Sequence, residues 1–102
     1  MSHRDVFVVS TARTAIGTFG GSLKDVHNTQ LATTAVKAAI ARSGLAPDAV
    51  GHVVMGNVIP TDTKDAYLSR VAAIDAGCPI ETPAFNVNRL CGSGLQAIIS
   101  AA

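Results

Sequence analysis

Cys91 is the residue of this sequence whose type and surroundings best suit chemistry. It lies in the run Asn88–Gln96 (NRLCGSGLQ), between a strand-like stretch and a small-residue stretch that predicts the start of a helix. The first N–H groups of a helix lack partners within it and carry positive partial charge, which favours a thiolate over a thiol. Gly92 and Gly94 lack the Cβ atoms that would block an approach to the sulfur. We therefore predict a nucleophilic cysteine at position 91.

The residues leave two other interpretations of this run open. A free cysteine is most often an inert, buried apolar residue. The run Gly92–Ala97 (GSGLQA) also fits the relaxed dinucleotide-binding pattern G-x-G-x-x-G/A, whose glycines let a pyrophosphate approach the backbone. The acidic residue that this pattern expects about 20 positions later would follow Ala102. The alternative to a cysteine enzyme is thus a dinucleotide-binding α/β module that uses the Gly92/Gly94 loop.

Cys78 stands between Gly77 and Pro79 and predicts no chemistry. Its spacing from Cys91 matches neither a C-x-x-C redox pair nor a zinc site, and two cysteines do not make a disulfide framework. We therefore expect Cys78 to be structural, and we expect no metal site.

The elements that position Cys91 alternate between strands and helices. The sequence predicts strands over Val6–Val9, His52–Met55 and Pro83–Val87, and helices over Thr29–Ser43 (with Asn28 as N-cap and Gly44 at C′), over Asp65–Ala76 and from Gly92 onward. The order βαβαβα predicts an α/β fold, a mostly parallel sheet with helices on both faces. Ligands bind at the carboxyl ends of such strands. Chemistry is therefore expected at three junctions, Ser10–Gly21, Gly56–Lys64 and Asn88–Gly94.

Composition excludes several classes of function. The 102 residues are 48% hydrophobic and 15% charged, with a net charge of +1 at pH 7 and no basic cluster. Nucleic-acid binding is therefore not expected. The apolar runs are far shorter than the roughly 20 residues that cross a bilayer, and the N-terminus leads directly into a strand-like run instead of a signal-peptide core. We expect a cytoplasmic protein with no nucleic-acid and no membrane partner.

The apolar content is high for a domain of this size, because a small domain leaves much of its surface in water. The last residues, Gln96–Ala102, also have the pattern of a helix that continues. We therefore expect the chain to be the N-terminal part of a larger protein, or half of an assembly.

Several stretches together resemble one known family. The run Asn88–Ala97 resembles the nucleophile motif of the thiolases, and Arg13–Leu23 (RTAIGTFGGSL) resembles their N-terminal signature. Gly56–Ile59 and Arg70–Ala72 are similar to a further thiolase stretch. The resemblance covers the chain from about Val6 to Ala102.

For the fold, the resemblance implies the first part (βαβαβα) of the N-terminal half of the thiolase fold. Each half of that fold holds a five-stranded sheet in the order 3-2-1-4-5. Residues 1–102 would form the N-terminal part of the thiolase N-terminal domain, and the rest of that domain and the C-terminal domain would be absent from this chain. The resemblance also implies a homodimer or homotetramer, with Pro83–Asn88 near the dimer interface.

For the function, the resemblance implies a transferase of fatty acid metabolism, an acyl-CoA C-acyltransferase that forms or cleaves 3-ketoacyl-CoA. Cys91 would carry the acyl group as a thioester, and its backbone N–H would contribute to an oxyanion hole. Coenzyme A and acyl-CoA thioesters would be substrates, with no bound cofactor, and the coenzyme A-binding residues stay unknown.

Thiolases also use an activating histidine and a second cysteine. The residues of those types outside position 91 do not match the motifs for either role; they are His3, His27, His52 and Cys78. The chain alone is therefore expected to be inactive.

Overall fold

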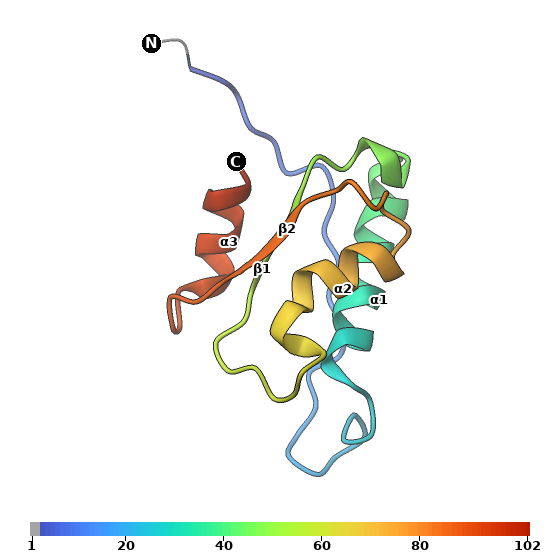
Figure 1. Cartoon of the computed structure of the whole chain (residues 1–102), viewed down its shortest axis with the longest axis vertical. Coiled ribbons are helices and arrows are strands. Elements are labelled where there is room, and N and C mark those ends of the chain that lie inside the picture. The colour runs from blue at the N-terminus through green and yellow to red at the C-terminus, as the bar shows by residue number, and fades with distance from the viewer. Residues whose placement is uncertain (1–2) are drawn as a thin grey trace.

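A computed structural model describes residues 3–102 of the chain (Figure 1). Met1 and Ser2, which the expected domain includes, lie outside the described residues. The elements in chain order are α1 (Asn28–Ser43), η1 (Pro47–Ala49), β1 (Val53–Gly56), η2 (Asp65–Tyr67), α2 (Leu68–Asp75), β2 (Ala84–Val87) and α3 (Ser93–Ala101), where η marks a single 3₁₀ turn. The α/β class predicted from the sequence is confirmed.

The two strands β1 and β2 pair in parallel, from Val53 opposite Ala84 to Gly56 opposite Val87. Helix α3 lies on one side of this pair and α2 on the other, and α1 packs against α2 (Figure 1). Since the strands are parallel, their carboxyl ends meet at one edge. The N–H of Asn57 donates to the carbonyl of Val87 across that edge, at 3.0 Å.

The expected strand Val6–Val9 is wrong, because the segment is irregular in the structure and its four side chains are 62–77% exposed. β-Branched residues favour an extended backbone, but a strand also needs the N–H and C=O groups of a neighbour. Among the described residues, no hydrogen bond joins this segment to β1. Val6, Phe7 and Val8 instead line a groove that also includes Met55 and Ala97.

Helix α1 begins one residue earlier than predicted. Its N-cap is His27, whose Nδ1 accepts a hydrogen bond from the N–H of Thr29 at 3.1 Å, so the prediction of Asn28 as N-cap is wrong. The physical reason is that the Asn28 amide bonds to Asp65 instead. Gly44 ends the helix with φ 74°, the left-handed conformation predicted for it.

The second predicted helix, Asp65–Ala76, divides into the 3₁₀ turn η2 and the shorter helix α2. Helix α2 carries the two most buried apolar residues, Ala72 and Ala73, neither of which is exposed at all. Their small side chains let α2 pack closely against its neighbours. The guanidinium of Arg70 donates to the carbonyls of Thr82 (2.7 Å) and Ile80 (2.8 Å), which fixes the turn that leads into β2.

The apolar core of the described residues is small. Its members are Ala32, Leu68, Ala72, Ala73, Ala76, Cys78 and Ala97. Many larger apolar side chains stay in water, among them Val8 at 77% and Phe19 at 109% exposure. No helix within residues 3–102 has both the length and the apolar character needed to cross a bilayer.

Candidate active site

Cys91 lies in the turn that joins β2 to α3, at the carboxyl end of the strand pair, where the sequence placed it. Its side chain is exposed. The next residue, Gly92, is the N-cap of α3. The interpretation of Cys91 as a buried residue does not fit this exposure, since the residue is open to solvent in this chain.

The turn before Cys91 contains a left-handed residue. Leu90 has φ 46°, and it is the one non-glycine residue with positive φ among the described residues. The Oδ1 atom of Asn88 accepts a hydrogen bond from the Leu90 N–H at 3.0 Å. The N–H of Gly92 donates to the carbonyl of Arg89 at 3.0 Å. The peptide on the N-terminal side of Cys91 is therefore held in a conformation that L-residues rarely adopt.

Ser93 closes the same turn from the helix side. Its hydroxyl accepts from the N–H of Arg89 and donates to the carbonyl of Leu90, both at 2.7 Å. The residue is 4% exposed. Sequence reasoning missed Ser93. The available signal was a hydroxyl residue at a helix start, where serine commonly bonds to nearby backbone groups.

The second predicted junction supports this turn from the end of β1. Gly56 packs directly against the backbone of Ser93. The amide of Asn88 donates to the carbonyl of Val58 at 3.2 Å. The segment after β1 therefore helps to position the Cys91 turn, although it adds no nucleophile to it.

The first predicted junction reaches this region only in part. Ser10 and Thr11 are bound to α1, through a hydrogen bond from Ser10 to Ala39 at 2.7 Å and one from Arg42 to Thr11 at 2.9 Å. Ala12 lines an open groove of about 700 Å³ that also includes residues 56 and 94. Residues 15–20, 23 and 24 line a separate hollow together with Leu31 of α1.

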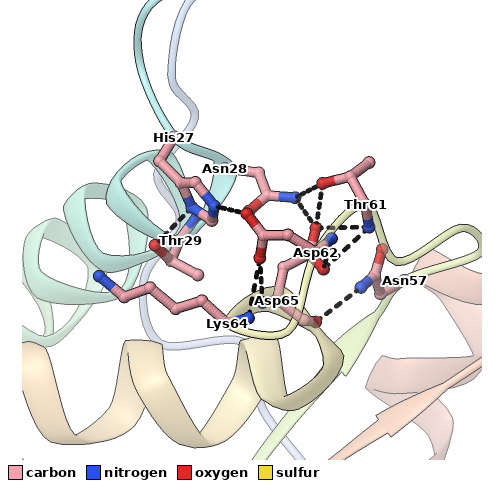
Figure 2. A network of polar contacts seen from close by, with 8 residues as sticks. All are labelled: His27, Asn28, Thr29, Asn57, Thr61, Asp62, Lys64 and Asp65. Carbon is pink, nitrogen blue, oxygen red and sulfur yellow. Dashed lines mark hydrogen bonds and ion pairs between the residues drawn. The ribbon is translucent and has the colours of Figure 1, made fainter.

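A polar cluster centred on Asp65 lies where α1 begins (Figure 2). Asp65 is fully buried. Its carboxylate accepts from the Thr61 N–H at 2.9 Å, from the Thr61 hydroxyl at 2.5 Å, from the Asp62 N–H at 3.0 Å and from the Asn28 amide. These hydrogen bonds, foremost those from Thr61 and Asn28, hold the pKa of Asp65 far below its ordinary value.

The cluster extends to both the helix and the strand edge. His27 Nε2 lies 2.5 Å from Asp62 Oδ2, and this hydrogen bond is the main reason that the pKa of Asp62 is lowered. The amide of Asn57 donates to the backbone carbonyl of Asp65 at 3.2 Å, as Figure 2 shows. The cluster therefore ties the start of α1 to the residue that follows β1, and sequence reasoning did not find it.

The other cysteine and the histidines lie outside the Cys91 turn. Cys78 is buried, and burial raises the pKa of its thiol. His27 belongs to the polar cluster, His52 donates from Nε2 to the carbonyl of Ala101 at 3.0 Å, and His3 is exposed. In the part of the chain that the structure describes, no three His, Cys, Asp or Glu side chains gather closely enough to hold a metal ion.

Comparison with known proteins gives consistent matches along the chain. Residues 6–102 match the family model described as thiolase, N-terminal domain. The beta-ketothiolase BktB of Cupriavidus necator is 62% identical over 99 residues, which are 97% of this chain and 25% of that protein. An acetyl-CoA acetyltransferase of Clostridioides difficile is 42% identical over 94 residues, which are 92% of this chain and 87% of that sequence.

A solved structure gives the same result for the fold. The crystal structure of human mitochondrial 3-ketoacyl-CoA thiolase in complex with CoA superimposes with a TM-score of 0.88 and 45% identity, over 92% of this chain and 24% of that one. The chain thus spans about a quarter of the length of this structure and of the Cupriavidus relative.

Proposed function

This chain belongs to the thiolase family, and on that premise we propose that the protein containing it is an acyl-CoA C-acyltransferase that forms or cleaves 3-ketoacyl-CoA. The observation that carries the proposal is the exposed Cys91 in a fixed turn between β2 and α3, within the stretch that matches the family. The names of the relatives, beta-ketothiolase and acetyl-CoA acetyltransferase, support this reaction class.

In the proposed reaction, the sulfur of Cys91 attacks the thioester carbonyl of an acyl-CoA. A new bond forms between this sulfur and the acyl carbon, the bond from that carbon to the coenzyme A sulfur breaks, and coenzyme A leaves with the proton that the thiol loses. The backbone N–H of Cys91 is the proposed donor to the oxyanion of the tetrahedral intermediate. In the condensation, a second acyl-CoA loses a proton from its α-carbon to a base supplied by the rest of the protein; that carbon then bonds to the acyl carbon as the bond from the acyl carbon to the Cys91 sulfur breaks. In the reverse direction, Cys91 attacks the 3-keto carbon of 3-ketoacyl-CoA and the C2–C3 bond breaks, so that acetyl-CoA leaves with a proton returned to its α-carbon. The acyl group then passes from Cys91 to the sulfur of coenzyme A, whose thiol loses its proton.

The test is to acetylate the complete protein and to locate the added group. The protein is incubated with acetyl-CoA and digested at acidic pH, and the acetylated peptide is identified by mass spectrometry. We expect the acetyl group on Cys91. Cys91→Ser should lower the rate by several powers of ten, each worth about 1.4 kcal/mol of barrier. Cys78→Ser is the matched control and should change the rate little. An acetyl group on Cys78, or an active Cys91→Ser protein, would contradict the proposal.

The dinucleotide-binding alternative is not favoured, because the matches in sequence and structure are to thiolases. Calorimetry with NAD distinguishes the acyltransferase from a dinucleotide-binding module. We expect no saturable binding of NAD to the complete protein, whereas micromolar NAD binding that Gly94→Val abolishes would restore the alternative.

We further propose that residues 1–102 form the N-terminal part of the thiolase N-terminal domain, within a longer protein. The exposed apolar side chains, such as Val8 and Phe19, support this because the described residues do not cover them. Expressed alone, residues 1–102 should be poorly soluble and should not cleave acetoacetyl-CoA. A soluble, monodisperse and active protein of these residues would contradict the proposal.

A homodimer or homotetramer with Pro83–Asn88 near the interface is part of the same proposal. Within the described residues, β2 pairs with β1 on one side, and Phe85 is 45% exposed. In the complete protein, the amides of β2 should exchange slowly with solvent, and dilution that dissociates the oligomer should accelerate their exchange. Exchange that does not respond to dissociation would place the interface elsewhere.

The cytoplasm is the proposed compartment of the protein, to be tested by cell fractionation.

A further inference from the structure

We infer that Ser93 is a positioning residue for Cys91. This inference rests on the proposed function, in which Cys91 carries the acyl group. Ser93 is the first residue of α3 and is 4% exposed. Its hydroxyl accepts from the N–H of Arg89 and donates to the carbonyl of Leu90, each at 2.7 Å. One side chain therefore holds the peptide group between Asn88 and Arg89 and the peptide group between Leu90 and Cys91.

The conformation that these bonds hold is an unfavourable one. Leu90 has φ 46°, and L-residues avoid this region because Cβ approaches the following carbonyl oxygen. The bond from Ser93 fixes the carbonyl of Leu90, and the bond to Asn88 Oδ1 fixes its N–H. When the hydroxyl is removed, Leu90 can relax to negative φ. The peptide that joins Leu90 to Cys91 then rotates, and it carries both the sulfur and the N–H of Cys91 to new positions.

Helix α3 keeps its other anchors when the hydroxyl is lost. The N–H of Gln96 still donates to the carbonyl of Gly92 at 2.9 Å, and the N–H of Ala102 still donates to that of Ile98 at 3.1 Å. The N–H of Ser93 also donates to the carbonyl of Leu90 at 3.1 Å, and this longer bond breaks when the Leu90–Cys91 peptide rotates. Substitution of Ser93 by alanine therefore removes the two hydroxyl bonds that hold the turn and leaves the bond from Gln96 to Gly92 within the helix in place. The effect should appear in the rate of acyl transfer more than in the folded fraction.

The first experiment compares Ser93→Ala, Ser93→Thr and the control Ser100→Ala in the complete protein. Ser100 lies in the same helix, where its hydroxyl accepts from the Gln96 amide at 3.1 Å. The single-turnover rate of Cys91 acetylation is followed by mass spectrometry at increasing acetyl-CoA concentration. Ser93→Ala should lower the maximal rate by about 10- to 100-fold, as expected when a reacting atom is misplaced, with little change in the half-saturating concentration. Ser93→Thr, which keeps the hydroxyl, should recover most of the rate, and Ser100→Ala should match the unsubstituted protein.

The second experiment tests the link through Leu90, whose side chain is 69% exposed. Glycine adopts positive φ without penalty, whereas β-branched valine resists it. Leu90→Gly combined with Ser93→Ala should therefore regain part of the lost rate relative to Ser93→Ala alone. In the protein that keeps Ser93, the Leu90→Val variant should be acetylated on Cys91 more slowly than the Leu90→Gly variant. The two Leu90 variants test whether the left-handed conformation at position 90 positions Cys91, even if Ser93→Ala does not fold. Equal acetylation rates in these two variants would overturn the inference.

The outcomes separate the inference from the proposed function. If the unsubstituted protein acquires no acetyl group on Cys91, the proposed function fails. If that protein is acetylated on Cys91, and Ser93→Ala is acetylated at the same rate per folded molecule, the inference about Ser93 fails alone. A lower melting temperature of Ser93→Ala with an unchanged acetylation rate would also overturn it, since a purely structural role predicts that result.

Discussion

Gly56, the last residue of β1, lies against the backbone of Ser93, the first residue of α3. A Cβ atom at position 56 would stand 2.8 Å from the carbonyl carbon of Ser93 and 2.9 Å from its oxygen, and 3.0 Å from the nitrogen of Gly94. These are backbone atoms, which cannot rotate away as a side chain can. The end of β1 and the start of α3 therefore approach to a distance that requires glycine at position 56.

Gly56→Ala should destabilise the fold and displace the Cys91 turn. Overpacking against a fixed backbone costs about 1–3 kcal/mol, and we expect a loss of this size in the free energy of unfolding, measured by denaturant titration of the complete protein. The acetylation rate of Cys91 should fall in the same variant. Gly51→Ala is the matched control, because a Cβ atom there meets nothing within 4 Å. Equal stability of the two variants would show that the contact at Gly56 relaxes freely.

The two cysteines should differ in their rates of alkylation. Cys91 is exposed, whereas Cys78 is buried and its pKa is raised by burial. Since the thiolate is the reacting form, iodoacetamide should modify Cys91 at least about tenfold faster near neutral pH. Peptide mapping by mass spectrometry at timed intervals measures both rates. In denaturant the rates should converge, and similar rates in the folded protein would contradict the assigned burial.

Asp65→Asn should destabilise the junction between α1 and the loop after β1. The carboxylate accepts from several donors of Thr61, Asp62 and Asn28, whereas an asparagine offers one acceptor oxygen and brings an NH₂ group against those donors. In the complete protein, we expect the melting temperature to fall by roughly 2 °C or more. The control is Asp48→Asn, at an exposed position, which should leave the melting temperature nearly unchanged.

The same carboxylates predict how stability depends on pH. The pKa values of Asp62 and Asp65 are lowered in the folded chain, so folding favours their charged forms. Their stabilisation is therefore complete above the unfolded-state pKa of about 4 and is lost progressively as the pH falls below it. Urea unfolding between about pH 6 and pH 3 should show this loss, and Asp65→Asn should flatten the curve relative to Asp48→Asn. A variant curve parallel to that of the control would contradict the assignment.

The helices were predictable from the sequence because their signals are local. Gly44 predicted the end of α1, and the structure confirms the cap there. The N-cap was misassigned because the Asn28 amide bonds to Asp65, a residue far along the chain. Local preference for a cap is weak enough for such a partner to override it.

The strands show the limit of sequence reasoning more clearly. The β-branched run Val6–Val9 predicts an extended backbone, but whether it forms a ladder depends on neighbours that its own residues do not specify. For the site, the position of Cys91 before α3 followed from glycine and strand signals. The left-handed Leu90 did not, because leucine itself disfavours that conformation, and the bonds from Asn88 and Ser93 impose it.

The parallel pairing of β1 with β2 has a consequence for the order of folding. The two strands are joined through η2 and α2, so their pairing requires closure of a long loop, which is slow compared with formation of a helix. The hydrogen bond from Asn57 to Val87 and the contact of Gly56 with Ser93 both form across that closure. The turn that carries the nucleophile can therefore reach its final geometry only after the strands have paired. In a refolding experiment, recovery of Cys91 acetylation should lag behind recovery of the helical circular dichroism signal.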